Sequence, residues 1–188
     1  MRKAEGTELA RGYSVARYRR LEAARDKRGI ANLLSKRFTE RYLAPTLARH
    51  NVKHGFTTLA VGCLMLEALE SFRQGWLDTK HRSKEAFCLF FHEHDEFAPF
   101  RGHGERFYYD VRCGILHQAE TRGRWKIRRK GPLFDEVDRA VNATKFMRNL
   151  GRVLKIYCRI LAQHDWESDL WKHCRKKMDA ICKACRSC

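Results

Sequence analysis

Apolar side chains recur along most of the chain at spacings of three and four residues, the period of an amphipathic α-helix. The run from Val52 to Trp76 is apolar around most of its helical circumference, which is typical of a central helix in a bundle. Shorter helices are predicted over residues 30–44, 87–98, 103–120, 143–161 and 170–185. The pattern predicts a mainly α protein, a single bundle of five to six helices.

Three residues are expected to mark helix ends. Pro45 and Pro99 lack the backbone N–H that a helix interior needs, so each is predicted to stop the helix before it. Asn142 suits an N-cap position, because its side chain can accept a hydrogen bond from a free N–H of the first turn.

The period changes from helical to alternating near Trp125. Trp125 and Ile127 alternate with basic residues, and Gly131-Pro132 follows, which predicts a short strand and a turn. A stretch near 139–141 is the expected pairing partner. The sequence therefore predicts a small two-stranded β ribbon inserted in the bundle.

Residues 1–28 are the most polar part of the chain, with nine Lys or Arg against four acids. We expect either a basic N-terminal arm or a loosely packed helix there, and one helical bundle domain over 29–188.

Composition narrows the classes of protein. With 188 residues, 44% of them hydrophobic, the chain can bury one core without disulfides or metal. The apolar run from Leu59 to Leu66 is too short to span a membrane, and no secretory signal is evident in the first ten residues. The eight cysteines are therefore expected to be free thiols in a cytoplasmic protein.

The formal net charge of +17 calls for an anionic partner. Nucleic acid is the first expectation and an anionic membrane surface the second, with a merely soluble basic protein as the third reading. Because we expect RNA as the partner, no membrane association is predicted.

The segment from Tyr109 to Gln118 combines Arg112 with His117 in an apolar frame. The planar guanidinium of an arginine can hold a phosphate through two parallel hydrogen bonds. An imidazole, with an ordinary pKa near 6.5, can exchange a proton with a ribose hydroxyl or a leaving oxygen. Together they suffice for RNA cleavage without a metal. The spacing itself is unspecific, since it recurs at Arg49/His54 and Arg159/His164.

The frame around Arg112 and His117 resembles the motif of the HEPN superfamily of RNA-cleaving and nucleotide-binding helical domains. The shared features are an aromatic residue three before Arg112, an apolar residue just before it, a glycine after it, and an apolar pair before His117. The resemblance implies a metal-independent endoribonuclease that acts by 2′-hydroxyl attack, with Arg112 and His117 as catalytic residues and no cofactor. It also implies a homodimer, and a toxin or phage-defence effector with a cognate antitoxin or inhibitor protein.

Cys113 departs from the motif, which usually has a polar Asn, Asp or His at this position. This departure favours an alternative, a non-catalytic RNA- or nucleotide-binding module of the same type. A further alternative is an interaction protein whose positive charge merely docks an acidic partner.

Helix geometry bears on the motif as well. Five residues at 100° each place Arg112 and His117 about 140° apart on a regular helix. Convergence on one phosphate then requires a distortion, for which Gly114 is the expected place, or a second copy of the chain. Tyr108 lies one turn before Arg112, and Glu120 lies close after His117, where it could hold the imidazole in one tautomer.

A basic stretch with no acidic residue follows the motif. A strand with cations on one face and apolar groups on the other can follow a nucleic-acid backbone. The predicted nucleic-acid-binding residues are Arg122, Arg124, Trp125, Lys126, Arg128, Arg129 and Lys130.

Two groups of residues suggest a metal, and we predict none in either. His92 and Glu96 share a predicted helical face, but a third ligand such as His103 would have to come from a loop. Cysteines recur every third residue at the C-terminus, yet on a helix the three thiols rotate apart. These are Cys182, Cys185 and Cys188.

Overall fold

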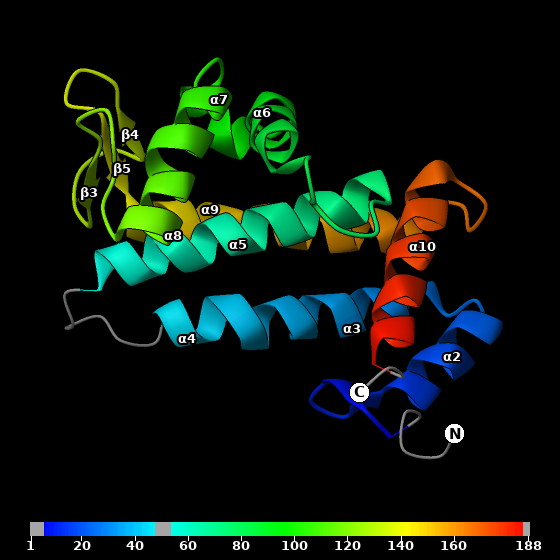
Figure 1. The fold of residues 1–188 in the computed structure, drawn as a ribbon. Helices are drawn as coiled ribbons and strands as arrows, with labels where there is room; N and C mark the ends of the chain where they lie inside the picture. Colours follow the sequence, from blue (N-terminus) through cyan, green and yellow to red (C-terminus); the bar gives the residue numbers. More distant parts are fainter. Residues whose placement is uncertain (1–5, 48–53, 186–188) are drawn as a thin grey trace. The chain divides into compact units, whose positions relative to one another are not determined.

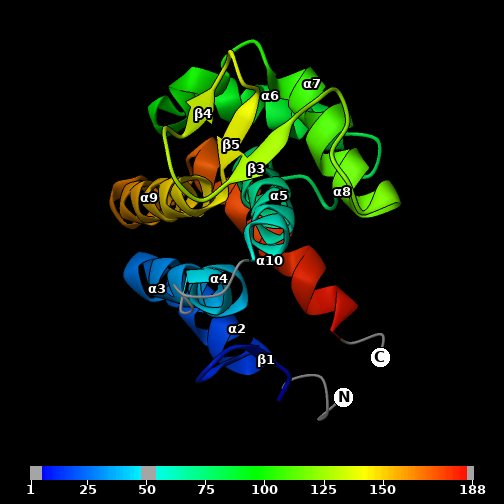
Figure 2. The ribbon, with the colours of Figure 1, turned by 90° about the vertical axis from the view of Figure 1, so that its left-hand side faces the viewer.

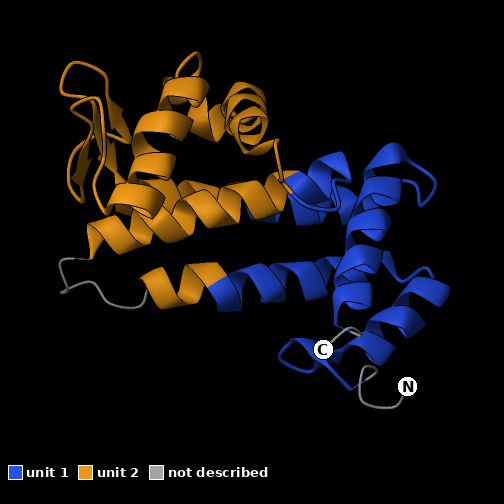
Figure 3. Cartoon of the chain, viewed as in Figure 1, with its two compact units in different colours: residues 1–41, 71–78, 154–188 blue, residues 42–70, 79–153 orange. Residues whose placement is uncertain are grey.

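The structure, a computed structural model, describes residues 6–47 and 54–185. Of the described residues, 68% are helical, which confirms the predicted mainly α fold class (Figure 1). The chain divides into two compact units (Figure 3). Unit 1 comprises residues 1–41, 71–78 and 154–188, and unit 2 comprises residues 42–70 and 79–153. Two of the unit boundaries, at 70/71 and 153/154, lie within the long helices Gly55–Gln74 and Ala143–Gln163, where the continuous apolar period of the sequence gives no sign of a boundary.

Unit 1 begins with a two-stranded antiparallel sheet, β1 (Glu8–Ala10) and β2 (Tyr13–Ser14). Helices α2 (Val15–Ala23), α3 (Lys27–Phe38) and α10 (Asp169–Ala184) belong to the same unit. Tyr18 of α2 is fully buried, and its hydroxyl donates to Glu22 Oε1 (2.9 Å). The described part of the basic N-terminal segment is therefore ordered and packed in this unit.

Unit 2 is built on the N-terminal part of α5 (Gly55–Gln74) and of α9 (Ala143–Gln163). Helix α6 (Ser83–Glu93), a 3₁₀ helix (Asp95–Phe100), α7 (Gly104–Arg106), a π-helix (Phe107–Cys113) and α8 (Gly114–Gln118) follow one another on one side of them (Figures 1 and 2). Buried phenylalanines fill the space between. Phe107, for example, stacks on Phe146 with ring centres 5.6 Å apart.

Unit 2 also contains a three-stranded sheet with the order β3 (Lys126–Arg128), β5 (Ala140–Asn142), β4 (Phe134–Asp135). The predicted strand and its predicted partner do pair, in parallel, with Lys126 opposite Ala140. The chain after Gly131-Pro132 adds β4 antiparallel to β5, a strand that was not predicted. The sheet lies beside α8 and the start of α5 (Figures 1 and 2).

The predicted helix ends were wrong at both prolines and confirmed at Asn142. Pro45 lies in α4 (Ala44–Leu47), which continues directly from α3 through a π-helix (Thr39–Leu43), so the helical segment does not stop before this proline. Pro99 lies inside the 3₁₀ helix, after α6 has already ended. Asn142 caps α9, since its Oδ1 accepts from the Lys145 amide (3.0 Å).

By length and composition alone, α5 is apolar enough to cross a membrane. However, most of this helix is buried within the protein, and the core helix of a soluble protein has the same length and composition. This helix is weak evidence for membrane insertion.

Candidate functional site

Arg112 is held by Glu67 of α5, a residue that was not predicted to belong to the site. Its Nε donates to Glu67 Oε1 (2.7 Å) and its Nη2 to Glu67 Oε2 (3.3 Å). The side chains are 17% and 7% exposed, respectively, so most of the ion pair is removed from water. Glu67 directly follows the longest apolar run of the sequence, and an acidic residue within a predicted core helix was the signal that could have found it.

Two hydroxyl groups complete the surroundings of the Glu67 carboxylate. Thr79 Oγ1 (3.1 Å) and Ser83 Oγ (2.8 Å) both donate to Oε2. Partial burial by itself would lower the pKa of Arg112, but the hydrogen bond and charge of Glu67 outweigh it, so that this pKa is raised. The guanidinium therefore remains charged and is fixed in position.

Tyr108 and Cys113, the residues predicted to support the motif, lie beside Arg112. The Arg112 guanidinium carbon lies 5.7 Å from the centre of the Tyr108 ring. The pKa of Tyr108 is raised, first by desolvation and then by a hydrogen bond with Cys113. Cys113, at the polar position of the motif, is partly exposed and not fully buried.

The helix is distorted at Arg112 and not at Gly114. Arg112 belongs to the π-helix, whereas Gly114 has regular helical angles (φ −57°, ψ −52°). The glycine serves another purpose. A Cβ at this position would lie 2.6 Å from the Glu120 carbonyl oxygen, so only glycine lets the following chain return so close to the helix.

His117 is exposed in the last turn of α8, which ends at Ala119 in the left-handed conformation (φ 55°). Glu120, which we expected could orient the imidazole, instead accepts a hydrogen bond from the Thr121 amide through Oε1 (2.8 Å). The segment that follows α8 runs back along the π-helix and is fixed there, because the Arg122 amide donates to the Asp110 carbonyl (2.7 Å).

Several cations of the basic stretch have partners within the protein. Asp138 pairs with Arg128 (2.7 Å) and with Lys126 (3.2 Å), and the hydrogen bonds from these two residues lower the pKa of the Asp138 carboxyl. Arg122 Nε donates to Gln118 Oε1 (2.9 Å) and Arg129 Nε to Thr144 Oγ1 (3.3 Å). Arg124 and Lys130 are exposed.

Trp125 was predicted to contact nucleic acid, but its ring is a core group. The side chain is only 6% exposed. Its ring stacks on Phe134 with centres 5.2 Å apart and meets Phe107 edge to face at 5.6 Å. We therefore assign Trp125 to anchoring β3, and not to stacking on a base.

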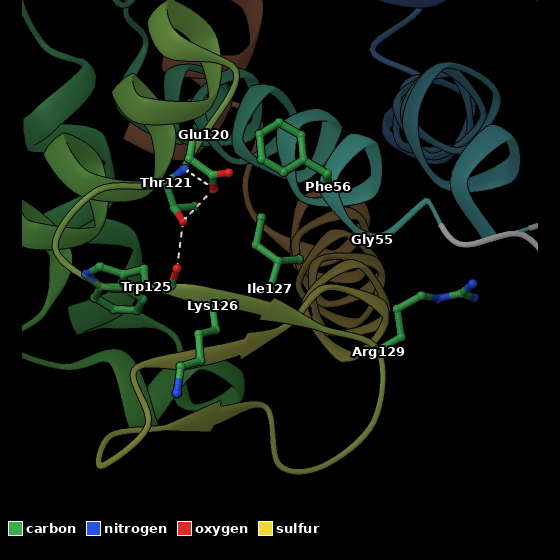
Figure 4. Close-up of a pocket in the computed structure, with 8 residues that line it drawn as sticks. All are labelled: Gly55, Phe56, Glu120, Thr121, Trp125, Lys126, Ile127 and Arg129. Atoms are coloured by element: carbon green, nitrogen blue, oxygen red, sulfur yellow. Dashed lines mark hydrogen bonds between the residues drawn. The ribbon is translucent and has the colours of Figure 1, made fainter.

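A pocket of about 570 Å³ lies between β3, the start of α5 and the chain after α8 (Figure 4). It contains one predicted supporting residue, Glu120, and three of the predicted nucleic-acid-binding residues, Trp125, Lys126 and Arg129. Neither Arg112 nor His117 lines it. The lining residues are Gly55, Phe56, Glu120, Thr121, Trp125, Lys126, Ile127 and Arg129.

The two groups considered for a metal do not come together. Helix α6 ends at Glu93, so His92 and Glu96 do not share a helical face, and His103 instead pairs with Glu136 (3.3 Å). Of the C-terminal cysteines, Cys182 and Cys185 lie on or just after α10, and Cys188 lies outside the described residues. Within residues 6–47 and 54–185, no three potential ligands are grouped for a metal ion.

No protein-family model matches the sequence, and neither a curated protein nor a solved structure is significantly similar to the chain. The resemblance to HEPN domains consequently rests on the residues around Arg112 and His117.

Proposed function

We propose that the protein is a HEPN-like endoribonuclease that cleaves RNA without a metal ion, by attack of a ribose 2′-hydroxyl. The observation that carries the proposal is the π-helix at Arg112. Such segments are rare and occur frequently at functional sites. This one holds a fixed guanidinium a few residues before an exposed imidazole, which are the two groups that the chemistry requires.

The two side chains have distinct roles in this proposal. His117, open to solvent, exchanges the proton of the 2′-hydroxyl or of the leaving 5′-oxygen. Arg112 stabilises the negative charge that develops on the phosphate. It does so through the guanidinium N–H groups that do not donate to Glu67. Arg124 and Lys130 provide exposed positive charge for the RNA backbone.

The proposed active form is a homodimer that brings two motifs to one cleft. Exposed apolar side chains near the motif support it, since Tyr109 is 47% exposed, Leu116 45%, and Leu64, one turn before Glu67, 44%. In a dimer, these side chains would be covered by the second copy of the chain. A cytoplasmic toxin or defence effector, restrained by a cognate inhibitor, fits such an enzyme.

A second candidate is a non-catalytic RNA-binding module of the same type. The Arg112–Glu67 pair favours this candidate. The Glu67 carboxylate already neutralises the guanidinium charge that would otherwise stabilise the phosphate during cleavage.

Incubation of the purified protein with RNA in excess EDTA tests the proposal. We expect cleavage by the wild type and its loss in His117→Ala and Arg112→Lys, since lysine keeps the charge but not the planar fork. The matched controls are His164→Ala and Arg159→Lys, because this pair has the same sequence spacing and is exposed in α9 and just after it. They should cleave normally.

Full cleavage by folded His117→Ala protein would refute the proposal. RNA binding that weakens with salt, without cleavage by the wild type, would establish the second candidate instead.

A further inference from the structure

The pocket beside β3 combines apolar walls with one fixed acceptor. Phe56 comes from the first turn of α5 and Ile127 from β3, and the Glu120 carboxylate points toward the space between them (Figure 4). The Lys126 side chain points to the other side of the strand. The volume of about 570 Å³ lies within the usual range for sites that bind small molecules.

The Glu120 carboxylate is held in place by the neighbouring chain. Its Oε1 accepts from the Thr121 amide (2.8 Å), and Thr121 is fixed in turn by the hydrogen bond from its hydroxyl to the Trp125 carbonyl (2.6 Å). An ionised carboxylate only accepts hydrogen bonds, so a ligand must present N–H or O–H donors to it.

The charge around the pocket restricts which donor is suitable. The chain carries a net charge of +17, Arg129 lines the pocket, and the first residues of α5 contribute the positive end of a helix dipole. A cationic donor such as an amine is disfavoured there. The surroundings favour a ligand whose donor edge is neutral and whose remainder is anionic.

A nucleotide has this distribution of charge. Its base is neutral and planar and can stack on Phe56, while its phosphate is anionic. Among the four RNA bases, only guanine presents two adjacent donors, N1–H and the 2-amino group, on its Watson–Crick edge. A carboxylate is the matching acceptor for that pair.

We propose that this pocket binds the guanine base of a nucleotide, with Glu120 accepting from N1–H and the 2-amino group. The inference rests on the proposed function insofar as the nucleotide belongs to an RNA substrate, and a free guanine nucleotide offers the same chemistry. Gly114 connects the pocket with the motif, because its missing Cβ lets the Glu120 backbone pack on the helix that carries His117.

Calorimetric titration of the His117→Ala protein tests the proposal without turnover. We expect guanosine 5′-monophosphate to bind at least about tenfold more tightly than adenosine 5′-monophosphate. Inosine 5′-monophosphate, which keeps N1–H but lacks the 2-amino group, should bind with intermediate affinity. Glu120→Gln should remove the preference, whereas Glu105→Gln, which changes the charge equally at an exposed ion pair outside the pocket, should preserve it. Equal affinity for the three nucleotides, no binding, or an unaltered preference in Glu120→Gln would overturn the proposal.

Titration with short single-stranded RNAs, with and without one guanine, separates the two sources of the base. Tighter binding of the guanine-containing RNA than of the free nucleotide identifies RNA, and the reverse identifies a free nucleotide. Guanine preference without metal-independent cleavage would refute only the proposed function. Cleavage without guanine preference would refute only the pocket assignment.

Discussion

At the scale of single residues, the site depends on a charge pair that is largely removed from water. Arg112 and Glu67 neutralise each other, and the hydroxyls of Thr79 and Ser83 complete the hydrogen bonding of the carboxylate. Such a pair contributes little net free energy, because desolvation offsets the attraction, but the loss of one partner leaves a buried charge without compensation. The pair therefore fixes the position of Arg112 more than it stabilises the fold.

We accordingly expect Glu67→Gln to reduce the free energy of unfolding by on the order of 3 kcal/mol, measured by denaturant titration. The double variant Glu67→Gln/Arg112→Met should be more stable than Glu67→Gln alone, because it no longer buries an unpaired cation. Glu105→Gln, at an exposed ion pair, is the control and should change the unfolding free energy by less than about 1 kcal/mol. Equal losses in the double and the single variant would contradict this account.

At the scale of elements, the motif helix and β3 are joined by a return of the chain that requires glycine. The close approach of the Glu120 carbonyl to Gly114 brings both Glu120 and Thr121 to the pocket. The π-helix precedes this contact and ends where α8 begins. The pocket and the candidate catalytic residues therefore depend on the same local packing.

Gly114→Ala should destabilise the protein by about 1–3 kcal/mol, because the added methyl group overlaps a backbone oxygen that has little room to move. Gly151→Ala provides a matched control, since its Cβ would make only ordinary contact with Leu43 at 3.5 Å. This change within α9 should be neutral or stabilise by up to about 1 kcal/mol. Thermal unfolding of the two variants measures the difference, and equal melting temperatures would show that the close approach is unimportant.

At the scale of the whole molecule, the proposed activity belongs to a pair of chains. A site that takes Arg112 from one protomer and His117 from its partner can be rebuilt from two inactive variants, whereas a site within one chain cannot.

Mixing Arg112→Lys with His117→Ala protein, followed by subunit exchange, should restore RNA cleavage in EDTA to about one quarter of the wild-type rate. Half of the dimers would be mixed, and half of their sites would be complete. Cleavage by the Arg112→Lys or the His117→Ala protein before mixing would invalidate the comparison. Absence of cleavage after subunit exchange would place both groups of one site in the same chain.

A Leu116→Asp variant should be monomeric by sedimentation and inactive, because it places a charge in the apolar interface.

The sequence by itself determined features that depend on neighbouring residues. The helical periods, the cap at Asn142, and the strand near Ile127 with its partner near Val141 follow from local patterns, and the structure confirms them. The motif around Arg112 and His117 could likewise be found without coordinates.

Only the tertiary structure decided what surrounds these residues. Glu67 meets Arg112 across 45 positions of sequence, Trp125 is covered by Phe107 and Phe134, and the pocket joins the start of α5 to β3. Periodicity reports which face of an element is buried but not which element covers it. Contacts between distant segments arise from packing, which a local pattern does not encode.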